Sequence, residues 1–264
     1  MKNKRLQKIY DTIYQKGEEQ HYTPNIFSSG KMREDRRAVL REVGWRGKNV
    51  IDVGCGTGEL AYHIARKGAN NILGIDYSPE AIEVALRTHH LRNLSFRVQD
   101  IEKIRGTFDV ITCMGTLEHT NDPFATLKFL KSHLTPRGSL IVTCPNWTNP
   151  RGYMLQLLFH LFRARITLAD LHYLTPIEFE RWAKQLRMSL SWRTVYHDWG
   201  VGEMLVADFQ RRLPNIVKEL PISVTKTQIG LFLAWLDDHM VPLEKRRGKS
   251  RFGGAVGIYH LRKI

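Results

Sequence analysis

The sequence has few cysteines, no long hydrophobic run and no low-complexity segment, and each absence excludes a class of protein. Its 264 residues include only three cysteines, Cys55, Cys113 and Cys144. An odd, scattered set argues against a disulfide-bonded framework and for reduced, buried thiols in the cytosol. No stretch approaches the ~20 apolar residues of a membrane-spanning helix. The charged N-terminus has no apolar segment behind it, which disfavours secretion. We expect a cytoplasmic protein of one elaborated domain.

Acidic residues are also scarce, and the formal net charge is +14. The excess lies in the flanks, because residues 1–48 carry a net charge of +6, residues 49–145 of zero and residues 146–264 of +8. Basic flanks predict a partner such as an anionic small molecule, an anionic membrane surface or a nucleic acid. A basic surface with no partner is the alternative, and the oligomeric state stays open.

The neutral central region opens with an apolar run, Val50 to Val53, that contains Asp52 and leads into glycines at 54, 56 and 58. This pattern predicts a buried parallel strand followed by a helix over residues 59–67. Glycines at such a turn let a ligand lie against the main chain. The third glycine of a dinucleotide fingerprint is absent, because its position holds Glu59. An acid at Asp52 would favour a cationic ligand and repel a pyrophosphate.

Further apolar runs follow, and they alternate with helical patterns. The second strand ends in Asp76, 18 residues beyond Gly58, where a carboxylate can hydrogen-bond ribose hydroxyls. Ser78 and Pro79 then open a helix. We expect the later strands at residues 94–100, 108–114, 139–143, 190–199 and 254–261, with a turn at 135–138. The pattern predicts a doubly wound α/β sheet with its ligand at the carboxyl ends of the strands.

The glycine turn and the acids that end the following strands resemble the motifs of class I S-adenosylmethionine (SAM) methyltransferases. This resemblance implies a Rossmann-like, doubly wound, seven-stranded α/β sheet, mostly parallel with an antiparallel last strand, plus helical lid and insert elements. It also implies SAM as the cofactor, with Asp76 at the ribose and Asp100 and Ile101 at the adenine. The remaining cofactor-binding residues that it implies are Asp52, Gly54, Cys55, Gly56, Gly58, Tyr77, Met114 and Gly115.

Around this core we expect an N-terminal helical cap at 1–45, a SAM-binding core at 46–200, a helical insert at 201–252 and a closing strand at 253–264. The core includes a lid helix at about 152–165. Its segment from Tyr153 to Arg165 is too apolar for an exposed helix and too short to span a bilayer. It either packs as a lid over the site or lies peripherally at the inner membrane face, with Arg163 and Arg165 near the lipid headgroups.

After the fourth strand, Leu117-Glu118-His119 resembles a segment of the ubiquinone-pathway (UbiG-like) O-methyltransferases, of methyltransferase types 11 and 23. The resemblance covers about residues 48 to 190. His119 could accept a hydroxyl proton, with Glu118 orienting it and His172 as a second base; alternatively, His119 only hydrogen-bonds its loop. Metal-binding members carry a further Glu where this chain has Gly115. We therefore expect no protein-held metal.

The combined prediction is a SAM-dependent methyltransferase that acts on a hydroxyl of a small-molecule or lipid-linked acceptor, including an anionic one. Two alternatives stay open. The basic flanks suggest an RNA or protein methyltransferase, although the Asn/Asp-Pro-Pro-aromatic motif of enzymes that methylate base amines is absent after the fourth strand. A SAM-binding partner subunit without catalysis is the other. The acceptor, and O-transfer as opposed to N- or C-transfer, stay open.

Overall fold

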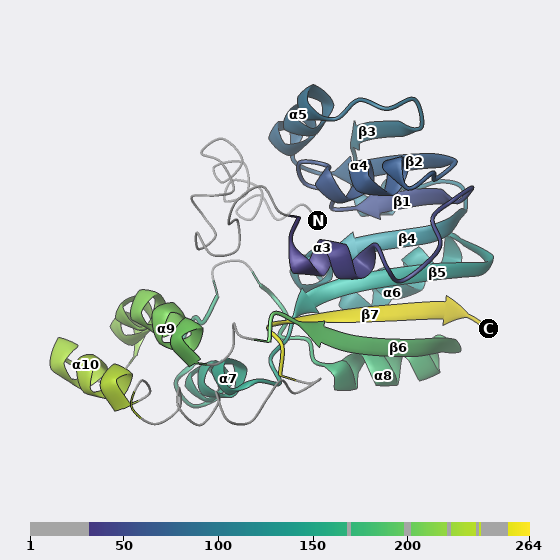
Figure 1. The fold of residues 1–264 in the computed structure, drawn as a ribbon. Helices are drawn as coiled ribbons and strands as arrows, with labels where there is room; N and C mark the ends of the chain where they lie inside the picture. The colour runs from purple at the N-terminus through teal and green to yellow at the C-terminus, as the bar shows by residue number, and fades with distance from the viewer. Residues whose placement is uncertain (1–31, 168–169, 198–201, 221–222, 236–237, 239–252) are drawn as a thin grey trace. The chain divides into compact units, whose positions relative to one another are not determined.

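The computed structural model describes residues 32–167, 170–197, 202–220, 223–235, 238 and 253–264. Its central element is a seven-stranded sheet in the order β3-β2-β1-β4-β5-β7-β6 (Figure 1). β7 runs opposite to the other strands, which are parallel to one another. The predicted fold class is therefore confirmed. The strands are β1 (Asn49–Val53), β2 (Asn71–Asp76), β3 (Leu94–Val98), β4 (Phe108–Met114), β5 (Leu134–Pro145), β6 (Met188–Val195) and β7 (Val256–Lys263).

Helices connect the strands at most of the predicted positions. The helices described are α3 (Glu34–Val39), α4 (Glu59–Arg66), α5 (Pro79–Thr88), α6 (Pro123–Ser132), α7 (Pro150–Phe162), α8 (Pro176–Gln185), α9 (Gly202–Ile216) and α10 (Lys226–Trp235). Short 3₁₀ helices are η2 (Ile101–Lys103), η3 (Leu117–His119) and η4 (Val217–Glu219). As expected, Ser78 caps α5, and its hydroxyl accepts a hydrogen bond from the backbone N–H of Ala81 at 3.3 Å.

The central strands form because their apolar runs can be buried on both faces. In β1, Val50, Ile51 and Val53 are almost fully buried, as expected for a parallel strand covered by helices. β1 pairs in parallel with β2 on one side and with β4 on the other, so that Asp52 lies opposite Thr112. The carboxyl ends of these three strands therefore meet at one edge of the sheet, where the predicted cofactor residues stand.

The start of the fifth strand was predicted wrongly. The turn expected at 135–138 is part of β5, which begins at Leu134 and runs for 12 residues. Between the pairs Phe108 with Leu134 and Val110 with Ser139 the register shifts. The turn formers are accommodated as an irregularity inside the strand, because β5 has four residues between these two pairs where β4 has one.

Smaller differences concern the ends of other elements. The third strand ends at Val98, two residues before Asp100, and the last strand begins at Val256. The sixth strand begins at Met188, two residues early, and ends at Val195. The last two residues of its predicted range, 198–199, lie outside the described residues, as do 1–31 of the predicted cap and most of the predicted insert beyond 235.

The chain divides into two compact units. The first comprises residues 1–144, 177–192 and 258–264 and contains most of the sheet; the second comprises residues 145–176 and 193–257. The predicted boundaries of cap, core and insert stay a prediction.

The second unit has its own hydrophobic core, formed where α7 packs with α9. Its buried members are Trp147, Leu155, Ala164, Ile166, Leu205, Phe209, Leu213 and Ile216. The other side of α7 is not covered in this way, because Tyr153, Leu157 and Leu161 are exposed. Among the described helices, none is both long and apolar enough to cross a membrane.

Candidate functional site

The turn between β1 and α4 requires glycine at its three key positions. Gly54, Gly56 and Gly58 have φ angles of +70°, +52° and +83°, in the left-handed region that other residues rarely adopt. A Cβ atom on Gly54 would stand 2.1 Å from the Oγ1 atom of Thr116, and one on Gly58 would stand 2.5 Å from the ring of Phe96. The main chain of the turn therefore lies directly against its neighbours.

Asp76, at the carboxyl end of β2, holds this turn in place. Its Oδ2 atom accepts a hydrogen bond from the backbone N–H of Gly56 at 2.9 Å, and its Oδ1 atom accepts one from the backbone N–H of Ser78, also at 2.9 Å. The carbonyl of Ile75 accepts the N–H groups of Gly54 and Cys55 at 2.8 and 3.0 Å. As a carboxylate, Asp76 offers acceptor oxygens, the kind of group that hydroxyl donors bind.

Asp52 is buried under the turn. The hydroxyl of Thr112 donates to its Oδ1 atom at 2.6 Å. Burial raises the pKa of Asp52 to about 6, because desolvation outweighs the lowering effects of the Thr112 hydrogen bond and of Arg36. Arg36, on α3, also forms an ion pair with Glu59 at the start of α4. The residues at this edge thus combine two buried acids with one nearby cation.

The raised pKa of Asp52 predicts a pH-dependent stability in the absence of ligand. The native state holds the proton more tightly than the unfolded chain, so this group's contribution is full below pH ~4 and is lost as the pH rises through about 6. A shift from 3.8 to about 6 corresponds to about 3 kcal/mol. Urea unfolding from pH 4 to 7 measures the free energy of unfolding of the wild type and of Asp52→Asn. The difference between these two free energies should change over this pH window. A difference that is constant with pH would contradict the assignment.

The segment after β4 carries the predicted catalytic residues. Gly115 follows Met114 with a φ of +56°, and its N–H bonds the carbonyl of Thr143 at 2.9 Å. The chain then forms η3, in which Leu117 and Glu118 are buried and His119 is partly exposed. His119 therefore stands at the surface of the segment, where a ligand from solvent can reach it.

Asp100 and Ile101 lie just after β3, and both are partly exposed. Asp100 precedes η2 and forms an ion pair with Lys103 at 3.9 Å. Since β3 is parallel to β2, this segment emerges at the same edge of the sheet as Asp76 and Tyr77. His172 belongs to the second unit. Direct contacts therefore join Gly54, Gly56, Asp76 and the segment after β4, and Asp100 and Ile101 emerge at the same edge of the sheet.

The three cysteines are free, and Cys113 and Cys144 are buried, as predicted. Burial raises the pKa of the Cys55 and Cys113 thiols well above its usual range. A thiol that stays protonated is a poor nucleophile. Neither of these two thiols is therefore set up as a nucleophile.

One group in the first unit had no signal in the sequence. The ring of Tyr259, on β7, stacks on Phe179 of α8 with 3.6 Å between the ring centroids. Its hydroxyl is buried and has no hydrogen-bond partner among the described residues. Burial raises the pKa of Tyr259, and Cys144, Glu178 and Glu118 add to this effect. The arrangement brings a phenol near Glu118 from a strand about 140 residues away in sequence, which local patterns cannot predict.

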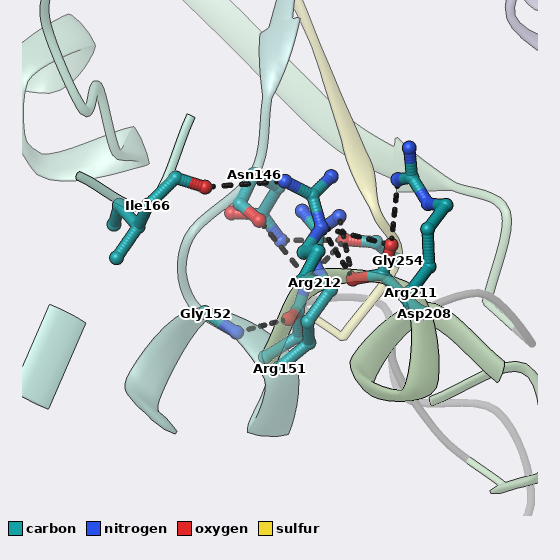
Figure 2. Close-up of polar contacts among 9 residues, drawn as sticks. Asn146, Arg151, Gly152, Ile166, Asp208, Arg211, Arg212 and Gly254 are labelled. Atoms are coloured by element: carbon teal, nitrogen blue, oxygen red, sulfur yellow. Dashed lines mark hydrogen bonds and ion pairs between the residues drawn. The ribbon is translucent and has the colours of Figure 1, made fainter. Parts of the chain in front are cut away.

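The loop after β5 is fixed by side-chain amides in the second unit (Figure 2). The amide nitrogen of Asn146 donates to the carbonyl of Gly254 at 2.7 Å, and that of Asn149 donates to the same carbonyl at 3.2 Å. The Oδ1 atom of Asn149 caps α7 by accepting the N–H of Gly152 at 2.8 Å. The predicted lid helix at about 152–165 therefore begins earlier, at Pro150, and ends at Phe162.

The fold and the glycine turn agree with comparisons to known proteins. A family model described as a methyltransferase domain matches residues 46–196. The ubiquinone biosynthesis O-methyltransferase of Xanthomonas campestris pv. campestris (strain B100) is 34% identical over 163 residues, which cover 58% of this chain and 67% of that protein. The enzyme of the same description from Xanthomonas euvesicatoria pv. vesicatoria (strain 85-10) is 35% identical over 155 residues, with coverages of 54% and 64%.

Solved structures share the fold at lower identity. Magnesium protoporphyrin IX methyltransferase from Synechocystis PCC 6803, crystallised with SAH, superposes with a TM-score of 0.57 and 16% identity over 97% of this chain and 98% of its own. A chain of the complex between the Haloferax volcanii Trm112 methyltransferase activator and a putative methyltransferase gives a TM-score of 0.57 and 18% identity, with 86% of each chain covered. Since the family model covers more than half of the residues, the chain belongs to the methyltransferase domain family and has the fold of its SAM-dependent members.

Proposed function

We propose that the protein transfers the methyl group of SAM to a hydroxyl of a small-molecule or lipid-linked acceptor. The observation that carries this proposal is the turn from Gly54 to Gly58, which presents bare main chain beside Asp52 and Asp76. The two relatives named as ubiquinone biosynthesis O-methyltransferases support transfer to oxygen. We propose a broader class of acceptors than the names of these relatives indicate, because the matches cover only about two thirds of each relative.

The cofactor would be held by residues at the carboxyl edge of the sheet. Asp76 would accept the ribose hydroxyls, and Asp100 and Ile101 would contact the adenine. The methionine end would lie against Gly54, Gly56 and Met114. The carboxylate of Asp52 would place negative charge near the sulfonium of SAM. The positive charge of the sulfonium would in turn lower the raised pKa of Asp52. The remaining proposed contacts are Cys55, Gly58, Tyr77 and Gly115.

Bound SAM would supply an activated methyl group, so the chain's own residues have to align the acceptor and remove its proton. His119 is the proposed base, because it is partly exposed and directly follows buried Glu118. The acceptor oxygen would form its bond to the methyl carbon as the carbon–sulfur bond breaks, and the hydroxyl proton would pass to the imidazole. His172 is the alternative base.

Asp76→Ala should weaken SAM binding by roughly 1.5 to 3 kcal/mol, about 10- to 150-fold, because the ribose hydroxyls would lose their acceptor. Isothermal titration calorimetry measures the change. Asp109→Ala is the matched control, because the Oδ2 atom of Asp109 also accepts a backbone N–H, that of Asn49, at 2.9 Å. Asn49 begins β1, at the opposite edge of the sheet. Unchanged SAM affinity in Asp76→Ala, or an equal loss in both variants, would remove Asp76 from the site.

A lipid-linked acceptor is supported by an exposed apolar stripe on α7. Tyr153, Leu157 and Leu161 are 62%, 54% and 69% exposed, and their spacing of four residues places them on one side of the helix. The helix ends at Arg163, and Arg165 follows. Such a helix suits a membrane interface, where its apolar side enters the boundary of the acyl chains and basic residues meet anionic headgroups.

This stripe predicts reversible binding to anionic membranes. The wild-type protein should float with vesicles of phosphatidylcholine and phosphatidylglycerol at low salt, and less so as salt is added. The double variant Leu157→Glu, Leu161→Glu should lose most of this binding, because it places two acids on the apolar side. Leu86→Glu, at a half-exposed leucine of α5 in the first unit, is the matched control. Equal recovery of all three proteins, or no flotation of the wild type, would contradict the membrane proposal.

The other acceptor classes have distinct signatures. RNA that copurifies with the protein and is methylated by it would move the acceptor to nucleic acid. SAM binding without any product, tested by mass spectrometry on host lipid and metabolite extracts, would favour a non-catalytic partner subunit.

A further inference from the structure

Three arginines surround one buried carboxylate in the second unit (Figure 2). Asp208, on α9, has a fully buried side chain. The Nε atom of Arg212 donates to both of its oxygens, at 2.9 and 2.8 Å, and a terminal nitrogen of Arg211 donates to Oδ1 at 3.1 Å. A terminal nitrogen of Arg151, at the start of α7, lies 4.0 Å from Oδ2. One carboxylate thus serves three guanidinium groups.

Counted over the described residues, the cluster carries more positive charge than its acids neutralise. Asp170, in the same unit, also favours the charged form of Arg151, but three cations against two carboxylates leave one positive charge. The pKa of Arg151 is lowered to about 10, chiefly by burial and also by Arg212 and Arg211, although the two acids act to raise it. A buried cation that lacks full compensation is costly unless another anion is present.

The Nε atom of Arg151 has no hydrogen-bond partner among the described residues. The side chain of Arg151 is only 7% exposed, and the Nε atom itself is buried. The Cζ atom of Arg151 stands 5.6 Å from the ring centroid of Trp147, so that one flat side of the guanidinium is covered. The donors of a guanidinium lie in its plane, where an oxyanion can bind them edge-on.

The cluster is open to solvent through the other two arginines. The side chain of Arg211 is 50% exposed and that of Arg212 is 24% exposed. Within the described part of the chain, Arg211 donates one hydrogen bond to Asp208, so most of its five donors remain for a ligand. An anion could therefore approach Arg211 and Arg212 from solvent and offset the charge that is buried at Arg151.

We propose that Arg151, Arg211 and Arg212 form a binding site for a phosphate group. Planar guanidinium groups that converge on one point are the usual protein partner of this oxyanion. Two kinds of ligand carry such a group: a free or small-molecule phosphate, and the headgroup of an anionic lipid. Because α7 carries both Arg151 and the exposed apolar stripe, the lipid source would join this site to the membrane proposal; phosphate binding itself does not depend on methyl transfer.

The test is a titration of the full-length protein with inorganic phosphate in the absence of SAM, with chloride added to keep the ionic strength constant. Calorimetry should show saturable binding that is about tenfold weaker in Arg211→Gln. Arg211 is half-exposed, so this variant should fold as the wild type does. Arg87→Gln is the matched control, because Arg87 is an exposed arginine of α5 that pairs with Glu83 at 3.9 Å; its affinity should be that of the wild type.

A second arm distinguishes the sources of phosphate. Stronger binding to phosphatidylglycerol vesicles than to soluble glycerol phosphate, lost in Arg211→Gln, assigns the site to a lipid headgroup; equal affinity for both assigns it to soluble phosphates. The proposal is overturned if phosphate and vesicles both fail to bind, or if Arg211→Gln and Arg87→Gln bind them equally. Neither result touches the proposed methyl transfer, which Asp76→Ala tests separately.

Discussion

Replacing Asp208 by alanine should lower the free energy of unfolding by about 3 to 5 kcal/mol, because three guanidinium groups would lose the carboxylate that they share. Burial alone would raise the pKa of Asp208, yet Arg212 and Arg151 hold it below its usual range. The ionised form is therefore the one that stabilises the fold. Urea unfolding in phosphate-free buffer, followed by circular dichroism, gives the size of the loss.

Two controls separate charge from packing in this experiment. Arg211→Gln removes an exposed partner and should cost less than about 1 kcal/mol. The double variant Asp208→Leu, Arg151→Met replaces a buried charged pair by apolar groups and should recover much of the loss. A cost below about 1 kcal/mol for Asp208→Ala would mean that the arginines do not depend on this carboxylate.

His119→Ala should lower the rate of methyl transfer by about 10²-fold or more and leave SAM affinity nearly intact, if His119 removes the acceptor proton. Single-turnover rates with saturating SAM, together with calorimetry, separate the two effects. The matched control is His133→Ala, at the end of α6, where the ring bonds the carbonyl of Gly106 at 2.7 Å. Gly106 precedes β4 and lies away from the glycine turn.

Other outcomes reassign the roles. A fully active His119→Ala variant would mean that His172 or water removes the acceptor proton. The absence of a protein-held metal, expected from Gly115, stays a prediction. Turnover that stops in EDTA and returns with magnesium would contradict it and would make Glu118 and His119 candidates for metal ligands.

Strands and turns that depend on local pattern could be predicted from the sequence. β2 and β4 have the predicted bounds, because each is an apolar run closed by a residue that is typical of a strand end. The positive φ angles of the glycine turn follow from the glycines themselves. β5 was misjudged at its start, because turn-forming residues can also be absorbed by a bulge, and only the pairing with β4 decides between the two.

Contacts between distant segments could not be predicted. Arg36 acts on Asp52, and Tyr259 stacks on Phe179, although each pair is separated by a long stretch of chain. Asp208 and its arginines lie in two helices, α7 and α9, for which the sequence predicted only a lid helix and a helical insert. Patterns in a single sequence report which side of an element is buried, but they do not report which element covers it.

The 2.1 Å between the Cβ position of Gly54 and the hydroxyl of Thr116 has a mechanical consequence. Thr116 stands directly before η3, and its hydroxyl donates to the carbonyl of Met114 at 3.0 Å. Because Gly54 has no side chain, the side chain of Thr116 packs directly against the main chain of the glycine turn. A displacement of either segment would therefore press on the other. We expect that a ligand bound against the glycines also fixes the position of the segment that presents His119.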